Sequence, residues 1–346
     1  MSYKQTKMFN VDKEISDLKK HQYIRDAALW ISEGEVVAFP TETVYGLGAN
    51  ALSETAIAKI FKAKGRPSDN PLIVHIASRD QLDELVTDIS AEAEKLMNAF
   101  WPGALTLIFK KKGSIAENVS AGLDTVAIRM PDHPVALELI REAGVPVAAP
   151  SANLSGKPSP TTAQHVYDDL AGRIAGVVDG GNTGVGLEST VLDCSVDIPM
   201  MYRPGGVTLE DIQQVIGEVA VDPTLMNTEG TPRSPGMKYA HYAPKGSLTV
   251  VRDVSMIQAL LNEASKQGRR VGVLTTEERA HEYQADAVIT CGKRSELLTV
   301  ASKLYDALRR FDQEKIDVIY AETFPKKGVG VAIMNRLEKA AGGRVI

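Results

Sequence analysis

The sequence predicts an α/β protein with two domains, and three observations support this. Short β-branched runs alternate with segments whose apolar residues recur at helical spacing, in both halves of the chain. The length of 346 residues exceeds the roughly 100–200 residues of an ordinary domain. Four prolines interrupt the pattern between residues 218 and 246. We therefore predict domains over residues 1–206 and 247–346, joined by a linker over 207–246.

The first domain is expected to contain a mixed sheet. Its first predicted strand, 36–39, ends at Pro40, and Ser53 can cap a helix whose apolar spacing continues to Gly65. Two pairs of later strands follow one another without a helix between them, which predicts antiparallel as well as parallel neighbours. Those later strands are predicted over 72–76, 105–110, 125–130, 146–149, 176–179 and 189–194, and helices near 90–100, 134–143 and 162–170.

The second domain alternates strands and helices more regularly. This order is typical of a small parallel sheet with right-handed crossovers, a Rossmann-like layer. No GxGxxG sequence follows its first strand, so the nucleotide-binding signature of that fold is absent. The strands are predicted over 247–251, 270–275, 286–291 and 316–321, and the helices over 255–267, 295–312 and 330–341.

Charge and composition argue against several classes of protein. The chain has 39 basic and 44 acidic side chains, and residues 1–200 alone carry 19 and 26, a balance of −7 that disfavours coating of a nucleic-acid backbone. No run approaches the ~18 apolar residues of a membrane span, and the start lacks a secretory signal, so we expect a cytoplasmic protein without membrane contact. Neither the cysteines, Cys194 and Cys291, nor the six histidines have metal-ligand spacing, so no protein-bound metal is predicted.

Polar segments stand at the ends of several predicted strands, where α/β proteins tend to bind ligands. The first is FPTETVYGLG, residues 39–48, in which Thr41 and Thr43 offer hydroxyls either to a ligand or to the caps of a turn. The second holds four cations within eight residues, which suit a phosphate group or, alternatively, a solvated helix end. These four cations are Lys59, Lys62, Lys64 and Arg66.

Three further segments complete this set. Arg129 ends the strand 125–130 and needs an anionic partner, either a ligand carboxylate or an internal acidic residue. The segment 146–153 is another strand that runs into polar residues, and the glycine-rich segment 179–190 lacks the GxxxxGK[ST] of a Walker A loop. GxSxG is absent, and the cysteines have no neighbouring histidines, so a covalent hydrolase is unsupported. The hydroxyl, amide and arginine groups instead suggest that the site positions a nucleotide and a second small molecule.

Taken in order along the chain, these segments resemble the threonylcarbamoyl-AMP synthase family in its two-domain form. The resemblance covers essentially the whole chain and implies a YrdC-like twisted mixed sheet with helices, followed by the Rossmann-like domain. The matching segments are PTETVYGLG, the KxR of residues 64–66 with DNPLIVHI behind it, TVAIRMP, the SxN of residues 151–153, ESTV, RPG and PGMKYAHYAP.

The resemblance implies a nucleotidyltransferase that condenses L-threonine, bicarbonate or CO2, and ATP into threonylcarbamoyl-AMP and pyrophosphate. The product would serve threonylcarbamoyladenosine modification beside the anticodon of tRNA. The resemblance further implies that Mg2+ accompanies the ATP and that the product is handed over to a tRNA threonylcarbamoyl transferase. It implies weak or indirect contact of this chain with tRNA itself. Lys64 and Arg66 are the expected catalytic residues, Thr43, His75, Arg129, Ala149 and Ser189 the L-threonine site, and Arg66, Asn70, Thr125, Ser151, Asn153, Ser159, Arg203 and Tyr242 the ATP site.

Two further expectations concern the linker and an alternative function. Because carbamates and mixed anhydrides hydrolyse readily, the 231–244 segment is expected to act as a lid that excludes water. The alternative function is an RNA-binding or ribosome-associated module that uses the basic cluster of residues 59–66. The acidic balance of residues 1–200 and the lack of an arginine-rich segment stand against this alternative.

Overall fold

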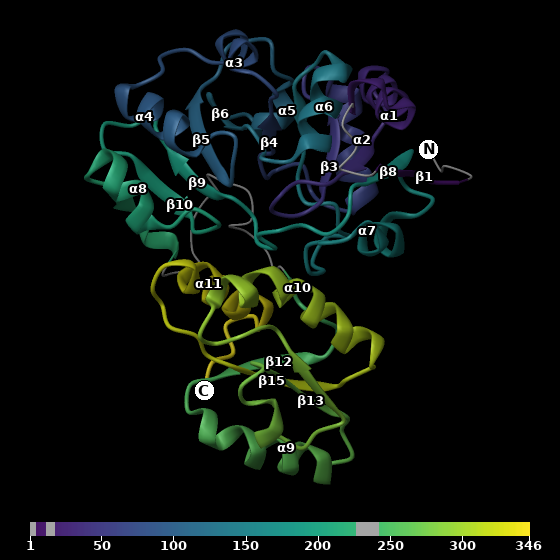
Figure 1. Cartoon of the computed structure of the whole chain (residues 1–346), viewed down its shortest axis with the longest axis vertical. Helices are drawn as coiled ribbons and strands as arrows, with labels where there is room; N and C mark the ends of the chain where they lie inside the picture. Colours follow the sequence, from purple (N-terminus) through teal and green to yellow (C-terminus); the bar gives the residue numbers. More distant parts are fainter. Residues whose placement is uncertain (1–4, 12–17, 226–241) are drawn as a thin grey trace. The chain divides into compact units, whose positions relative to one another are not determined.

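Two units make up the chain in the computed structural model, which describes residues 5–11, 18–225 and 242–346 (Figure 1). The second unit contains residues 242–346 together with two short segments, 156–159 and 185–187. The first unit contains the other described residues. Among the residues that the structure describes, no helix is both long and apolar enough to cross a membrane.

A large mixed sheet runs through the first unit. Its strand order is β1-β8-β2-β3-β7-β4-β6-β5-β9-β10-β11, with parallel pairs such as β4/β6 and antiparallel pairs such as β5/β6. The mixed sheet predicted from consecutive strands is therefore confirmed. The strands are β1 (Lys7–Asn10), β2 (Val37–Phe39), β3 (Gly46–Asn50), β4 (Ile73–His75), β5 (Leu105–Lys110), β6 (Thr125–Arg129), β7 (Val147–Ala148), β8 (Gly176–Asp179), β9 (Thr190–Asp193), β10 (Met200–Arg203) and β11 (Ala220–Val221).

Apolar clusters cover both faces of this sheet, and two of them pack it against helices. Along β2, Val37 and Phe39 belong to one cluster and Ala38 to the other, as expected from the alternation of side chains along a strand. The first cluster packs β1 and β2 against α1 and α6, and the second packs the sheet against α2, α4 and α7. The helices are α1 (Gln22–Ser32), α2 (Glu54–Lys64), α3 (Arg79–Leu85), α4 (Ala91–Phe100), α5 (Glu117–Ser120), α6 (Pro134–Ala143), α7 (Ala163–Leu170) and α8 (Leu209–Ile216), with 3-10 turns η1 (Leu18–Lys20) and η2 (Pro223–Leu225).

The helix α2 begins and ends at the residues that the sequence indicates. The Ser53 hydroxyl accepts a hydrogen bond from the backbone N–H of Ala56, which satisfies one of the free donors of the first turn. Gly65 adopts a left-handed conformation with φ of 64°, which glycine tolerates without a steric penalty. Lys64 is thus the last residue of the helix, and Arg66 lies just beyond it.

The structure places the strand β3 where the sequence suggested only a turn. Gly48 lies in this strand. The position requires glycine, because a Cβ atom there would lie only 2.8 Å from the side chains of Phe39 and Val147. Its glycines therefore serve close packing within the sheet rather than the turn itself. Alternation of apolar and polar residues, the usual signal of a strand, is missing from such a segment.

The segment 209–221 also differs from the expectation. It was assigned to the linker, but α8 packs against α4, and β11 pairs in parallel with β10. Both elements belong to the first unit. The helix α8 begins with a capping box between Thr208 and Asp211.

The second unit contains a four-stranded, wholly parallel sheet in the order β12-β15-β13-β14 among its described residues. This confirms the predicted Rossmann-like layer. Within this unit, α9 lies on one face of the sheet and α10 and α11 on the other (Figure 1). The elements are β12 (Ser247–Val251), β13 (Val271–Thr275), β14 (Ala287–Thr290), β15 (Val318–Glu322), α9 (Ile257–Lys266), α10 (Leu297–Gln313), α11 (Val329–Ala340), and the 3-10 turns η3 (Val254–Met256) and η4 (Ala280–Glu282).

Candidate active site at the strand ends

A turn between β2 and β3 presents the hydroxyl of Thr43. The Thr41 hydroxyl accepts hydrogen bonds from the backbone N–H groups of Thr43 and Val44 and donates to the Val44 carbonyl. The hydroxyls of Thr41 and Thr43 lie 2.8 Å apart. Because the Thr41 hydroxyl hydrogen is directed to the Val44 carbonyl, Thr43 is the donor between the two hydroxyls. The Thr43 oxygen then accepts from Nη1 of Arg129 at 2.8 Å. This chain of hydrogen bonds fixes the position of the Thr43 hydroxyl.

Arg129 stands at the end of β6 with its guanidinium almost wholly buried. Its Nε donates to the Gly103 carbonyl at 3.0 Å, and its Nη2 lies 2.5 Å from Oε1 of Glu42. The sequence left open whether this arginine pairs with a ligand or with an internal acid, and the structure shows that Glu42 supplies the internal partner. A buried guanidinium needs such an anion, because an unpaired charge would lose its hydration without compensation.

His75 lies beside Arg129 and carries no charge at neutral pH. The pairing of β4 with β6 places the two residues opposite each other. Burial, together with the positive charge of Arg129, lowers the pKa of His75 to about 3. The imidazole also makes an edge-to-face contact with Phe39, at 5.9 Å between ring centroids. This side of the site therefore holds a neutral imidazole, and the negative charge beside Arg129 comes from Glu42.

Ser189, which immediately precedes β9, and Arg203, the last residue of β10, form a second pair of polar groups. The Ser189 hydroxyl lies 2.7 Å from the Thr106 hydroxyl and accepts from Nη2 of Arg203 at 3.2 Å. The Nε of Arg203 donates to the Ser189 carbonyl at 3.0 Å. Gly205 makes this arrangement possible, because a Cβ atom there would overlap the backbone between Glu188 and Thr190. The glycine of the RPG segment is thus a close-packing residue.

Lys64 connects the KxR and SxN segments. Its buried ammonium donates to the carbonyls of Ser151, at 2.5 Å, and Asn153, at 2.7 Å. The Ser151 hydroxyl donates in turn to Oδ1 of Asn153 at 2.6 Å. Two short motifs that lie nearly ninety residues apart therefore form one structural unit, with its positive charge held in a fixed place.

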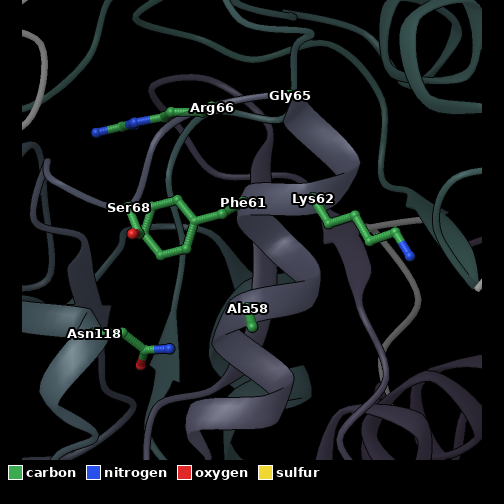
Figure 2. Close-up of a pocket in the computed structure, with 7 residues that line it drawn as sticks. All are labelled: Ala58, Phe61, Lys62, Gly65, Arg66, Ser68 and Asn118. Atoms are coloured by element: carbon green, nitrogen blue, oxygen red, sulfur yellow. The ribbon is translucent and has the colours of Figure 1, made fainter.

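Two of the four cations of residues 59–66 make contacts within the protein. Lys59 pairs with Glu35 at 2.8 Å, and the Lys64 ammonium is turned inward. Lys62 and Arg66 both line the pocket beside α2, and Figure 2 shows their side chains extending in different directions.

Arg66 lines an open pocket of about 470 Å³ that lies along the C-terminal part of α2 (Figure 2). Its Nη2 donates to the Asn70 carbonyl at 3.3 Å. The side-chain amide of Asn70 is fully buried, and neither its nitrogen nor its oxygen has a hydrogen-bond partner among the described residues. Buried amides are usually hydrogen-bonded, so this one is suited to a bound molecule.

The remaining candidate residues fall into two groups. In the first unit, Thr125 begins β6 and is partly exposed, and the backbone N–H of Ala149 donates to the Ile73 carbonyl. In the second unit, Ser159 is buried, and the buried ring of Tyr242 packs 5.1 Å from that of Tyr305. Residues 231–241 of the predicted lid segment lie outside the described residues.

Two residues of the site were not singled out from the sequence. Glu42 stands between the two threonines of the PTET segment, and this position beside Thr43 is a signal that could have found it. Thr106 lies inside an apolar strand, and nothing in the local sequence marks it, since its role depends on the pairing of β5 with β9.

Two family models match the chain. One, described as telomere recombination and built on Sua5, YciO and YrdC proteins, matches residues 30–205. The other, described as threonylcarbamoyl-AMP synthase, C-terminal domain, matches residues 207–342. The two matches together cover both units of the structure.

Known proteins resemble the chain over nearly its whole length. It is 62% identical to a threonylcarbamoyl-AMP synthase of Bacillus subtilis (strain 168), over 93% of this chain and 94% of that protein. It is 49% identical to a threonylcarbamoyl-AMP synthase of Pyrococcus abyssi, over 99% of each. The solved structure of P. abyssi Sua5 complexed with L-threonine superposes with a TM-score of 0.93 at 48% identity, again over 99% of each chain. The chain therefore belongs to the threonylcarbamoyl-AMP synthase family, in its two-domain form.

Proposed function

We propose that the chain condenses L-threonine, bicarbonate or CO2, and ATP into threonylcarbamoyl-AMP and pyrophosphate. The observation that carries this is the buried Arg129, oriented by Thr43 and Gly103, in a chain 48% identical to a protein solved with L-threonine. A guanidinium held in this way is suited to the carboxylate of an amino acid. Ser189, just before β9, and His75, at the end of β4, complete the proposed threonine site.

The proposed chemistry needs no protein nucleophile. The amine of threonine attacks CO2 and loses a proton, which gives an N-carboxylate. An oxygen of that carboxylate then attacks the α-phosphorus of ATP, and the bond to the β-phosphate oxygen breaks as pyrophosphate leaves. The task of the protein is to bring three reactants together and to stabilise charge, which fixed hydrogen-bond donors do without reorganisation.

Three cations are proposed to stabilise the phosphates. Lys64 and Arg203 are buried, and each is held by backbone carbonyls, so both present positive charge at a fixed position. Arg66 is the third cation, next to the buried amide of Asn70. Lys64 and Arg66 are the proposed catalytic residues. The other proposed ATP contacts are Thr125, Ser151, Asn153, Ser159 and Tyr242.

Mg2+ is proposed to enter as a complex with ATP. The part of the chain that the structure describes holds no group of three His, Cys, Asp or Glu side chains arranged for a metal ion. Mg2+ commonly retains several waters and binds through substrate phosphates. We therefore assign the ion to the triphosphate and derive no step through a protein-bound metal.

The product determines the proposed partners. Threonylcarbamoyl-AMP is a mixed anhydride that water destroys, so a tRNA threonylcarbamoyl transferase must receive it quickly. Direct contact of this chain with tRNA is proposed to be weak, because the first 200 residues carry a net charge of −7.

Pyrophosphate release with each substrate omitted in turn tests this function. We expect release to require L-threonine, bicarbonate and ATP together, and to fall when L-serine replaces L-threonine. A tRNA gel shift at increasing salt is the companion measurement. Strong, salt-sensitive tRNA binding without pyrophosphate release would favour the RNA-binding module instead.

A further inference from the structure

The ion pair between Glu42 and Arg129 is deeply placed in the proposed threonine site. The carboxylate oxygen Oε1 of Glu42 lies 2.5 Å from Nη2 of Arg129, and their side chains are only 15% and 4% exposed. The pair leaves the site electrically balanced. Any ligand that enters must preserve this balance, because an extra buried charge without a partner is strongly unfavourable.

Several polar atoms of the pair make no hydrogen bond within the described residues. The Nε and Nη1 atoms of Arg129 donate to Gly103 and Thr43. Its Nη2 atom and both carboxylate oxygens of Glu42 are buried, and none of the three makes a hydrogen bond of acceptable geometry within the described part of the chain. Glu42 and Arg129 are thus close enough to attract each other, yet they present an acceptor and a donor that a ligand can satisfy.

We propose that Glu42 is the specificity-determining residue that binds the α-ammonium group of the amino-acid substrate. An amino acid is a zwitterion, so its carboxylate can take Nη2 of Arg129 while its ammonium group takes the Glu42 carboxylate. One internal ion pair is then replaced by two pairs with the ligand, and the sum of buried charges does not change. The inference rests on the proposed function, in which Arg129 binds the substrate carboxylate.

The surroundings leave this role to Glu42. His75 faces Arg129 from β4, and it stays neutral because burial and the arginine lower the pKa of its ring. Thr43 accepts from Arg129 and donates to Thr41, and its neutral hydroxyl adds no negative charge. Without Glu42, the ammonium group of the substrate would lie beside the positive Arg129 with no compensating negative charge from these neighbours.

Calorimetric titration of the full chain with two ligands tests the proposal. One ligand is L-threonine, and the other is (2S,3R)-2,3-dihydroxybutanoate, which keeps the carboxylate and the β-hydroxyl but has a hydroxyl in place of the ammonium group. For Glu42→Gln we expect the affinity for L-threonine to fall roughly 10- to 100-fold, the range of a charge-assisted hydrogen bond. The affinity for the dihydroxy acid should stay the same or increase, and Glu42→Asp should restore much of the affinity for L-threonine.

The matched control is Glu94→Gln, which breaks the exposed 2.7 Å pair with Arg79 and should change neither titration. A parallel loss for both ligands in Glu42→Gln would overturn the proposal, because it would mean that Glu42 only holds Arg129 in place. Equal affinity of the unaltered chain for both ligands would overturn it as well, and that comparison does not depend on the folding of any variant. If the unaltered chain binds no L-threonine at all, the proposed function itself fails.

Discussion

Arg129 and His75 show how neighbouring residues decide what a side chain can do. Glu42, the Gly103 carbonyl and the Thr43 hydroxyl surround the positive charge of Arg129, and burial together with that charge keeps His75 neutral. A charged and a neutral group therefore stand side by side at the ends of two paired strands. A substitution at each of these two residues has an expected effect that can be measured.

Replacement of Arg129 by lysine is expected to raise the KM for L-threonine at least tenfold. A lysine ammonium is a single point of charge on a flexible stem, and it cannot reach Gly103, Thr43 and a substrate carboxylate together. Pyrophosphate release measured against L-threonine concentration gives this KM. The control is Arg141→Lys, at a half-exposed arginine that pairs with Glu138. An unchanged KM in Arg129→Lys would remove Arg129 from the proposed threonine site.

His75 is expected to make the protein sensitive to acid. Its pKa is about 3 in the folded protein against about 6.5 in the unfolded chain, so between these values the unfolded chain binds the additional proton. Stability should therefore fall as the pH drops below 6.5, by about 2 kcal/mol between pH 8 and pH 5. Thermal unfolding at both pH values measures this. His75→Gln should lose that part of the decrease, and an identical decrease in the variant would contradict the assignment.

At the scale of elements, the site depends on strand ends that the sequence indicated only in part. The strands 105–110, 176–179 and 247–251 have the predicted bounds, because each is a β-branched or apolar run with clear breaks. The strand β3 was missed, because close packing against Phe39 requires glycine where alternation would otherwise be seen. Thr106 was missed for a different reason, because only the pairing of strands that are distant in sequence brings it to Ser189.

The polar motifs were easier to find than their arrangement. Thr43, Arg129 and Ser189 stand out as polar groups beside apolar strands, and the structure connects Thr43 directly to Arg129. Local charge density does not reveal which way each side chain of the basic cluster extends. Lys64 turns inward to the SxN segment, which lies almost ninety residues away in sequence.

Gly205 provides a test at the scale of elements. For Gly205→Ala we expect a loss of about 1–3 kcal/mol of stability, because the added methyl group must displace the backbone of residues 188–190. The displacement should also weaken substrate binding through Ser189 and Arg203. Chemical denaturation and pyrophosphate release measure the two effects. The control is Gly113→Ala, at a position where a Cβ atom has no neighbour within 4 Å, and equal behaviour of the two variants would contradict this account.

At the scale of the whole molecule, buried positive charge is found at the proposed substrate sites. The first 200 residues are acidic in sum, yet three buried cations lie at the proposed ATP and threonine sites, Lys64, Arg129 and Arg203. Positive charge held locally inside an acidic protein favours small anionic substrates over a long polyanion. This contrast supports a synthase rather than an RNA-coating protein.

The measurement that tests the central claim most directly is pyrophosphate release from ATP by the full chain. The account predicts release only when L-threonine and bicarbonate are both present, with Mg2+ supplied for the ATP. It also predicts the loss of that release in Lys64→Ala, with the thermal midpoint recorded alongside to show that the variant is folded. Release that does not depend on L-threonine, or no release from the folded chain with all substrates present, would contradict the proposed function.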